Sequence, residues 1–242
     1  MATTQPEMGK NKTGVARSPK LVDEMVEATR KFEPNPAGDE HFIAAVRSEL
    51  ARELEPAGSG SPPAGARGLA RAAALKLKGG IDPVQLIDAL GERLAFERSG
   101  VRVYEALLSK LEAFGEFKGG PTREELLHIL TEEYEHFRLL EGTLLHLGAD
   151  PTAVTPSANA TATMTSGIVS AVLDPRTNLT HCLEGALMLE LADNESWETL
   201  VHMTRSAGQT KIADSFEEAS AQERDHVLNV REWVSAAKGL SA

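Results

Sequence analysis

Residues 90–111 read LGERLAFERSGVRVYEALLSKL and predict a helix with an unusual buried face. Apolar side chains recur there in steps of three and four, which is typical of an amphipathic helix. The members of this face are Leu90, Leu94, Val101, Tyr104, Leu108 and Leu111. Between Leu94 and Val101 the face passes through Glu97, although burying an unpaired carboxylate is strongly unfavourable. The helix therefore needs a partner for Glu97 that lies elsewhere in the chain.

Three further segments have apolar faces that are interrupted in the same way. Capping patterns and helix breakers predict four helices, over about 82–114, 122–147, 177–206 and 209–237. The second and fourth carry Glu-x-x-His pairs on their apolar faces, and the third carries one glutamate. These residues are Glu133 and His136, Glu223 and His226, and Glu190. A further pair, Glu125 with His128, is discounted because Glu125 completes a capping box with Thr122.

The order of these segments predicts the fold. No strand-like alternation occurs, so the fold class is all-α. Four long helices with a short, a long and a short connection predict a four-helix bundle with one crossover. The crossover, residues 149–177, is expected to contain a short helix near 166–173. Residues 1–80 are expected to form an extension with a disordered tail, two short helices and a flexible spacer, followed by the bundle at 81–242.

The two halves of the expected bundle match each other. The sequence EYEH at 133–136 aligns with ERDH at 223–226. Glu97 and Glu190 are each followed seven residues later by an aromatic residue, Tyr104 and Trp197. This correspondence predicts an internal two-fold repeat of a helical hairpin.

The buried acids and imidazoles indicate metal binding. The four glutamates carry a charge of −4, and the sequence places no Lys or Arg on these apolar faces to neutralise it. Two divalent cations would balance that charge. Residues three apart lie on nearly one side of a helix, so each Glu-x-x-His pair can bind one ion through both side chains. Carboxylate and imidazole ligands with open positions suit iron(II) or manganese(II).

This pattern resembles the ferritin-like superfamily of di-iron and di-manganese carboxylate proteins, in particular bacterioferritins and rubrerythrins. The resemblance covers residues 82–238 and rests on the interrupted faces, the Glu97-to-Tyr104 spacing and the segment EEYEHFRLLEGTLLHLGADP. It implies two iron or two manganese ions held by Glu97, Glu133, His136, Glu190, Glu223 and His226. Tyr104 and Trp197 are expected beside the metals, either as plain packing or as hydrogen-bond donors and redox-active neighbours.

Several neighbours of these residues have open roles. Asp193 is an additional ligand, a solvated acid, or a residue that contacts a ligand rather than the metal, and Asn194 is expected to hydrogen-bond a ligand. Glu135 and Asp225 each precede a histidine, and either is expected to orient an imidazole. For Glu135, a surface salt bridge is the alternative. Cys182, the single cysteine, is expected to be a small core residue.

Composition limits the partners. The net charge of −11 disfavours nucleic acid and anionic membranes. No apolar run approaches the length of a membrane span, and the N-terminal segment lacks the apolar core of a secretory signal. With one cysteine, no internal disulfide can form, which fits a cytoplasmic protein. The N-terminal helices are expected to cover the bundle or to support a homo-oligomer.

Three functions fit such a site. The first is an oxidoreductase that uses the paired metals on dioxygen or peroxide, with electrons from a donor protein or from peroxide itself. The second is iron oxidation and storage, which the additional residues before the bundle disfavour because cage-forming ferritin subunits are essentially the bundle alone. The third is a purely structural staple, which open coordination positions disfavour.

Overall fold

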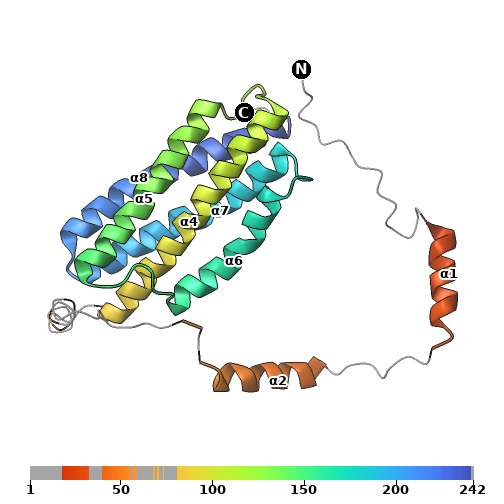
Figure 1. Ribbon diagram of the computed structural model, residues 1–242, viewed down its shortest axis with the longest axis horizontal. Helices are drawn as coiled ribbons and strands as arrows, with labels where there is room; N and C mark the ends of the chain where they lie inside the picture. Colours follow the sequence, from red (N-terminus) through yellow and green to blue (C-terminus); the bar gives the residue numbers. More distant parts are fainter. Residues whose placement is uncertain are drawn as a thin grey trace. The chain divides into compact units, whose positions relative to one another are not determined.

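The structure is a computed structural model that describes residues 18–32, 40–55, 57–58 and 81–240, with Gly68, Ala70 and Ala73. The expected disordered tail at 1–17 and most of the expected spacer at 56–68 lie outside the described residues. Within them the chain forms seven helices with defined bounds and no strand, which confirms the all-α class. Two units are distinguished, one with α1 and α2 and one with α4 to α8 (Figure 1). None of these helices is both long and apolar enough to cross a membrane.

The N-terminal region contains two short helices with defined bounds. They are α1 (Pro19–Thr29), which begins with its proline in the first turn, and α2 (Glu40–Glu53). Both are short, and neither has a fully buried side chain.

The first long hairpin begins and ends at the residues that the capping patterns predict. In α4 (Pro83–Phe114) the Asp82 side chain accepts a hydrogen bond from the Val84 amide at 3.0 Å. In α5 (Arg123–Leu147) Thr122 and Glu125 form the expected capping box. Gly148 ends α5 in the left-handed conformation, with φ of 83°, which glycine adopts without a Cβ clash.

The helix between α5 and the next long helix is longer than the sequence predicted. It is α6 (Pro156–Leu173), and it begins ten residues before the expected position near 166. Thr155 caps its first turn, and Pro156 occupies the first helical position. The start of α6 lies against α4, where Gly91 leaves room for the Thr155 side chain. Asp88 accepts hydrogen bonds from the Ser157 amide at 2.9 Å and from its hydroxyl at 2.7 Å.

The second hairpin consists of α7 (Leu179–Ser206) and α8 (Thr210–Ala237). Figure 1 shows α4, α5, α7 and α8 running alongside one another, with α6 along α4. Each hairpin is packed along its length, α4 contacts α7 closely, and α5 and α8 touch at only a few points.

Two apolar layers fill the interior of this unit and leave a polar region between them. One layer includes Leu107, Leu126 and Leu183, and Cys182 lies in it as the small buried residue that was expected. The other includes Leu90, Leu140, Trp197 and Phe216. A buried polar region between two apolar layers is shielded from water, so charges there interact strongly.

Candidate metal centre

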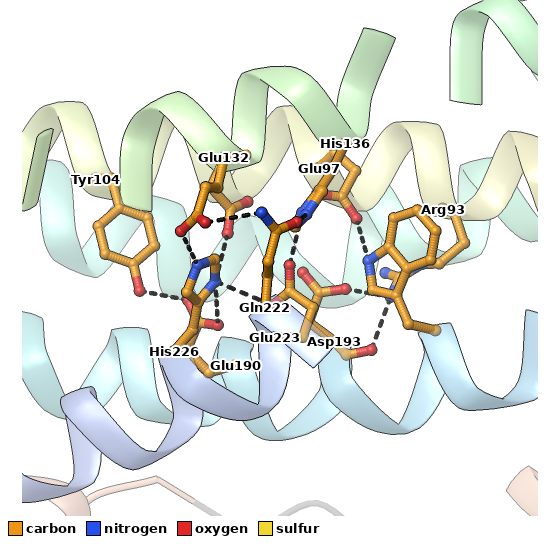
Figure 2. A network of polar contacts seen from close by, with 12 residues as sticks. Arg93, Glu97, Tyr104, Glu132, His136, Glu190, Asp193, Gln222, Glu223 and His226 are labelled. Carbon is orange, nitrogen blue, oxygen red and sulfur yellow. Dashed lines mark hydrogen bonds and ion pairs between the residues drawn. The ribbon is translucent and has the colours of Figure 1, made fainter. Parts of the chain in front are cut away.

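The carboxylates and imidazoles that interrupt the apolar faces converge in one polar network (Figure 2). This network lies between the two apolar layers. They come from four different helices, and each of the six residues is at most 2% exposed. The residues are Glu97 from α4, Glu133 and His136 from α5, Glu190 from α7, and Glu223 and His226 from α8. The structure thus brings together all six predicted ligand side chains, in overlapping groups that could each hold a metal ion.

The cluster has two sides that share carboxylates. On one, called here the His226 side, potential ligand atoms of His226, Glu190, Glu133 and Glu223 lie within 4.8 Å of one another. On the other, the His136 side, the same holds for His136, Glu97 and Glu223, and for Glu97 with Glu133, Asp193 and Glu223. Glu133 and Glu223 therefore reach both sides.

Both imidazoles turn the same nitrogen toward the carboxylates. His136 Nδ1 lies 2.8 Å from Glu223 Oε1 and 3.7 Å from Glu97 Oε2. His226 Nδ1 lies 3.3 Å from Glu223 Oε2 and 3.6 Å from oxygens of Glu133 and Glu190. Nδ1 is therefore the nitrogen that can bind a cation on each side.

The outward nitrogens are held by two residues that the sequence analysis did not select. His136 Nε2 lies 2.9 Å from Gln222 Oε1, and His226 Nε2 lies 2.9 Å from Glu132 Oε2. The prediction that Glu135 or Asp225 orients an imidazole is wrong, because both are exposed and contact neither ring. Glu135 follows Glu133 by two residues, which places it about 200° around the helix. The sequence signal for these two partners was available: Glu132 immediately precedes Glu133, and Gln222 immediately precedes Glu223.

Two aromatic donors cross between the halves of the repeat. The Tyr104 hydroxyl on α4 donates a hydrogen bond to Glu190 Oε1 on α7 at 2.5 Å. The Trp197 indole nitrogen on α7 donates to Glu97 Oε1 on α4 at 2.9 Å. Of the two readings left open for these residues, the structure supports hydrogen bonding, and each donor holds the carboxylate of the other hairpin.

A buried ion pair corrects the expectation that no basic residue lies near the cluster. Arg93 on α4 is 1% exposed, and its Nη1 contacts Asp193 Oδ1 and the Asp193 carbonyl. Asp193 itself is fully buried, so it is not a solvated acid. Its second oxygen accepts no hydrogen bond from a described residue, and Asp193 is one of the potential ligands on the His136 side. Arg93 was not predicted to be buried because it lies outside the apolar face of α4. The helix is covered by α5, α6 and α7, so side chains outside that face are buried as well.

A glycine makes room for one of the shared carboxylates. Gly100 lies in the middle of α4, and a Cβ at this position would overlap Glu133 Oε2. In the repeat, Gly100 and Asp193 are equivalent, since each follows the single glutamate by three residues. The two halves therefore differ at this point, with an open space on α4 and an acid on α7.

Other residues near the centre have simpler roles. The Asn194 amide oxygen accepts no hydrogen bond from a described residue, so its expected contact with a ligand is not formed through that atom. Glu125 serves the capping box and the His128 side chain is 72% exposed, which agrees with discounting this pair.

Several carboxylate oxygens in the cluster lack a donor. Both oxygens of Glu133, Oε2 of Glu97 and Oε2 of Glu190 accept no hydrogen bond from the described residues. The nearest imidazole nitrogens are 3.6 to 3.7 Å away, which is too long for a hydrogen bond. Buried polar atoms without partners are rare in folded proteins and call for a ligand, an ion or a proton.

The pKa values of several acids and imidazoles in the cluster are raised by burial and by neighbouring charges. Burial raises the pKa of Glu190 to about 7 and the pKa of Glu133 well above its usual value. Burial alone would lower the pKa of His136, but the Glu223 and Glu97 carboxylates raise it to about 11. The cluster on its own therefore retains protons at neutral pH, and a bound cation must displace them.

Comparison of the chain with known protein families, with curated proteins and with solved structures found no match. The all-helical fold and its buried Glu/His cluster are compatible with a ferritin-like fold. Identification of the site depends on its geometry and chemistry alone.

Proposed function

We propose that this protein is a ferritin-like dinuclear metal protein whose four long helices form a four-helix bundle, with α6 in the crossover. The observation that carries the proposal is the convergence of six acid and imidazole side chains from four helices in a water-shielded interior. Two hairpins with matching ligand patterns support the same conclusion.

Charge balance supports two divalent ions. The buried carboxylates are Glu97, Glu133, Glu190, Asp193 and Glu223. Arg93 neutralises Asp193 through their ion pair, and the remaining four negative charges match two divalent cations. Glu190 with His226 would hold one ion, and Glu97 with His136 the other. Glu133 and Glu223, which reach both sides, would be shared between them.

The ligand types favour iron or manganese, and the activity proposed is oxygen- or peroxide-dependent oxidation and reduction. When bound, two such ions would supply two-electron redox chemistry toward dioxygen or peroxide, with reductant from a donor protein or from peroxide itself. The chain's own residues exclude water through the apolar layers and hold a hydroxyl proton at Tyr104 beside Glu190.

Metal analysis of the full-length protein tests the site. We expect about two Mn²⁺ ions per chain after anaerobic loading, measured by elemental analysis. Glu223→Gln keeps the side-chain volume but removes the carboxylate that reaches both sides, so both ions should be lost while circular dichroism still reports helix. Glu218→Gln on the exposed face of α8 is the control and should bind as the unmodified protein does. Full metal content in the E223Q variant would contradict the assignment.

The same preparation separates the functions. Consumption of peroxide or dioxygen by the loaded protein, lost in the E223Q variant, supports the oxidoreductase. Retention of iron far beyond two ions per chain after addition of iron(II) in air would instead favour storage. Tightly bound metal with neither result would indicate a structural role.

A further inference from the structure

Glu132 and Gln222 break the two-fold symmetry of the centre. They occupy equivalent positions in the repeat, each immediately before the glutamate of a Glu-x-x-His pair. Each reaches across the gap between α5 and α8 to the histidine of the other helix (Figure 2). One is an acid and the other an amide, so the two imidazoles have chemically different partners.

A third hydrogen bond joins these two residues and fixes the direction of the network. Gln222 Nε2 donates to Glu132 Oε1 at 2.8 Å, because a carboxylate can only accept. The amide oxygen of Gln222 must then face His136, whose Nε2 donates to it. His226 Nε2 likewise donates to Glu132. With a proton on Nε2, each ring presents Nδ1 to the inside of the cluster.

The acceptor on the outer nitrogen changes how strongly an imidazole binds a cation. A carboxylate acceptor makes the ring a better ligand and holds its orientation. Hydrogen bonds to an ionised acceptor are also about twice as strong as those to a neutral one. His226 has the carboxylate of Glu132, and His136 has only the neutral amide oxygen of Gln222.

We propose that Glu132 and Gln222 are positioning residues that make the two metal positions unequal, with the His226 side binding a divalent cation more tightly than the His136 side. This inference rests on the proposed metal binding. The Arg93–Asp193 pair lies beside the His136 side and adds no net charge there, because its two charges cancel. An unequal pair would bind its second ion more weakly and would exchange that ion more readily.

Cobalt(II) titration of full-length variants that keep one histidine measures each position separately. His136→Ala retains the His226 side, and His226→Ala retains the His136 side. We expect H136A to bind one Co²⁺ at least tenfold more tightly than H226A does, with the absorption bands of bound Co²⁺ as the readout. Glu132→Gln in the H136A background should weaken binding about 10- to 100-fold.

The double exchange E132Q/Q222E gives the decisive result. It keeps the hydrogen bond between the two positions but moves the carboxylate from His226 to His136. Added to both single-histidine backgrounds, it should reverse the order of affinities, which a loss of fold would not do. Glu135→Gln makes the same charge change on the exposed face of α5 and should leave both affinities unaltered.

The possible outcomes distinguish failure of this inference from failure of the proposed metal binding. Equal affinities in H136A and H226A, or an order that the double exchange does not reverse, would overturn the inference while leaving metal binding intact. Absence of Co²⁺ binding by the unmodified protein would overturn the proposed function and this inference together.

Discussion

At the scale of single residues, the crossed donors Tyr104 and Trp197 hold the carboxylates of opposite hairpins. In Tyr104→Phe, Glu190 would lose the hydroxyl that reaches its Oε1 at 2.5 Å. A buried hydrogen bond to a charged acceptor contributes about 1.5 to 3 kcal/mol. We expect the metal-free Y104F variant to lose stability of that order at pH 8, measured by urea unfolding. The loss should be smaller at pH 5, where Glu190, with its pKa raised to about 7, is neutral.

A second tyrosine provides a matched control for this prediction. The Tyr134 hydroxyl donates to Glu105 at 3.1 Å on the exposed surface between α5 and α4. Tyr134→Phe removes a hydroxyl of the same kind where water can replace it, so stability should change little. Equal effects of the two substitutions would show that Tyr104 does not hold Glu190 in the way described.

At the scale of the elements, the position of α6 depends on its attachment to α4. Asp88 on α4 accepts both the Ser157 amide and its hydroxyl in the first turn of α6, so it acts as a helix cap supplied by another helix. Asp88→Ala should lower the free energy of unfolding by about 1 kcal/mol, as the loss of a capping side chain does. Urea unfolding measures this change. Glu112→Ala, an exposed truncation on the same helix, is the control and should have no comparable effect.

At the scale of the whole molecule, metal binding and folding stability should be coupled through pH. Burial raises the pKa of Glu190 to about 7, and neighbouring carboxylates raise the pKa of His136 to about 11, so these two groups bind protons more tightly in the folded metal-free protein than in the unfolded chain. The stability these groups contribute is therefore fully present at low pH, and the part from Glu190 is lost as pH rises from about 4.5 to about 7.

A cation competes with those protons, so its effect has the opposite dependence on pH. Saturating Mn²⁺ should raise the midpoint of thermal unfolding strongly at pH 8 and much less at pH 5.5. Differential scanning calorimetry with and without Mn²⁺ measures both values. The E223Q variant should show no metal effect at either pH, and a metal effect that is equal at both would mean that no protons are displaced.

Much of this arrangement could be predicted from local patterns. Capping residues such as Asp82, Thr122 and Asn178 act within one turn, and the corresponding helix ends are therefore readable from the chain. The length of α6 was not predicted, because its Ala-, Ser- and Thr-rich segment lacks the contrast between apolar and charged faces. Its capping residues, Thr155 and Pro156, were the available signal.

The sequence by itself determined the all-helical class and the residues that gather inside the fold, because a carboxylate on an apolar face is buried and therefore needs polar or cationic partners from other helices. Tertiary structure decided what surrounds them. Arg93 pairs with Asp193, and Glu132 and Gln222 reach the histidines, only because of the way that whole helices are placed and rotated against each other. Such rotations are set by packing over many side chains, and no local pattern records them.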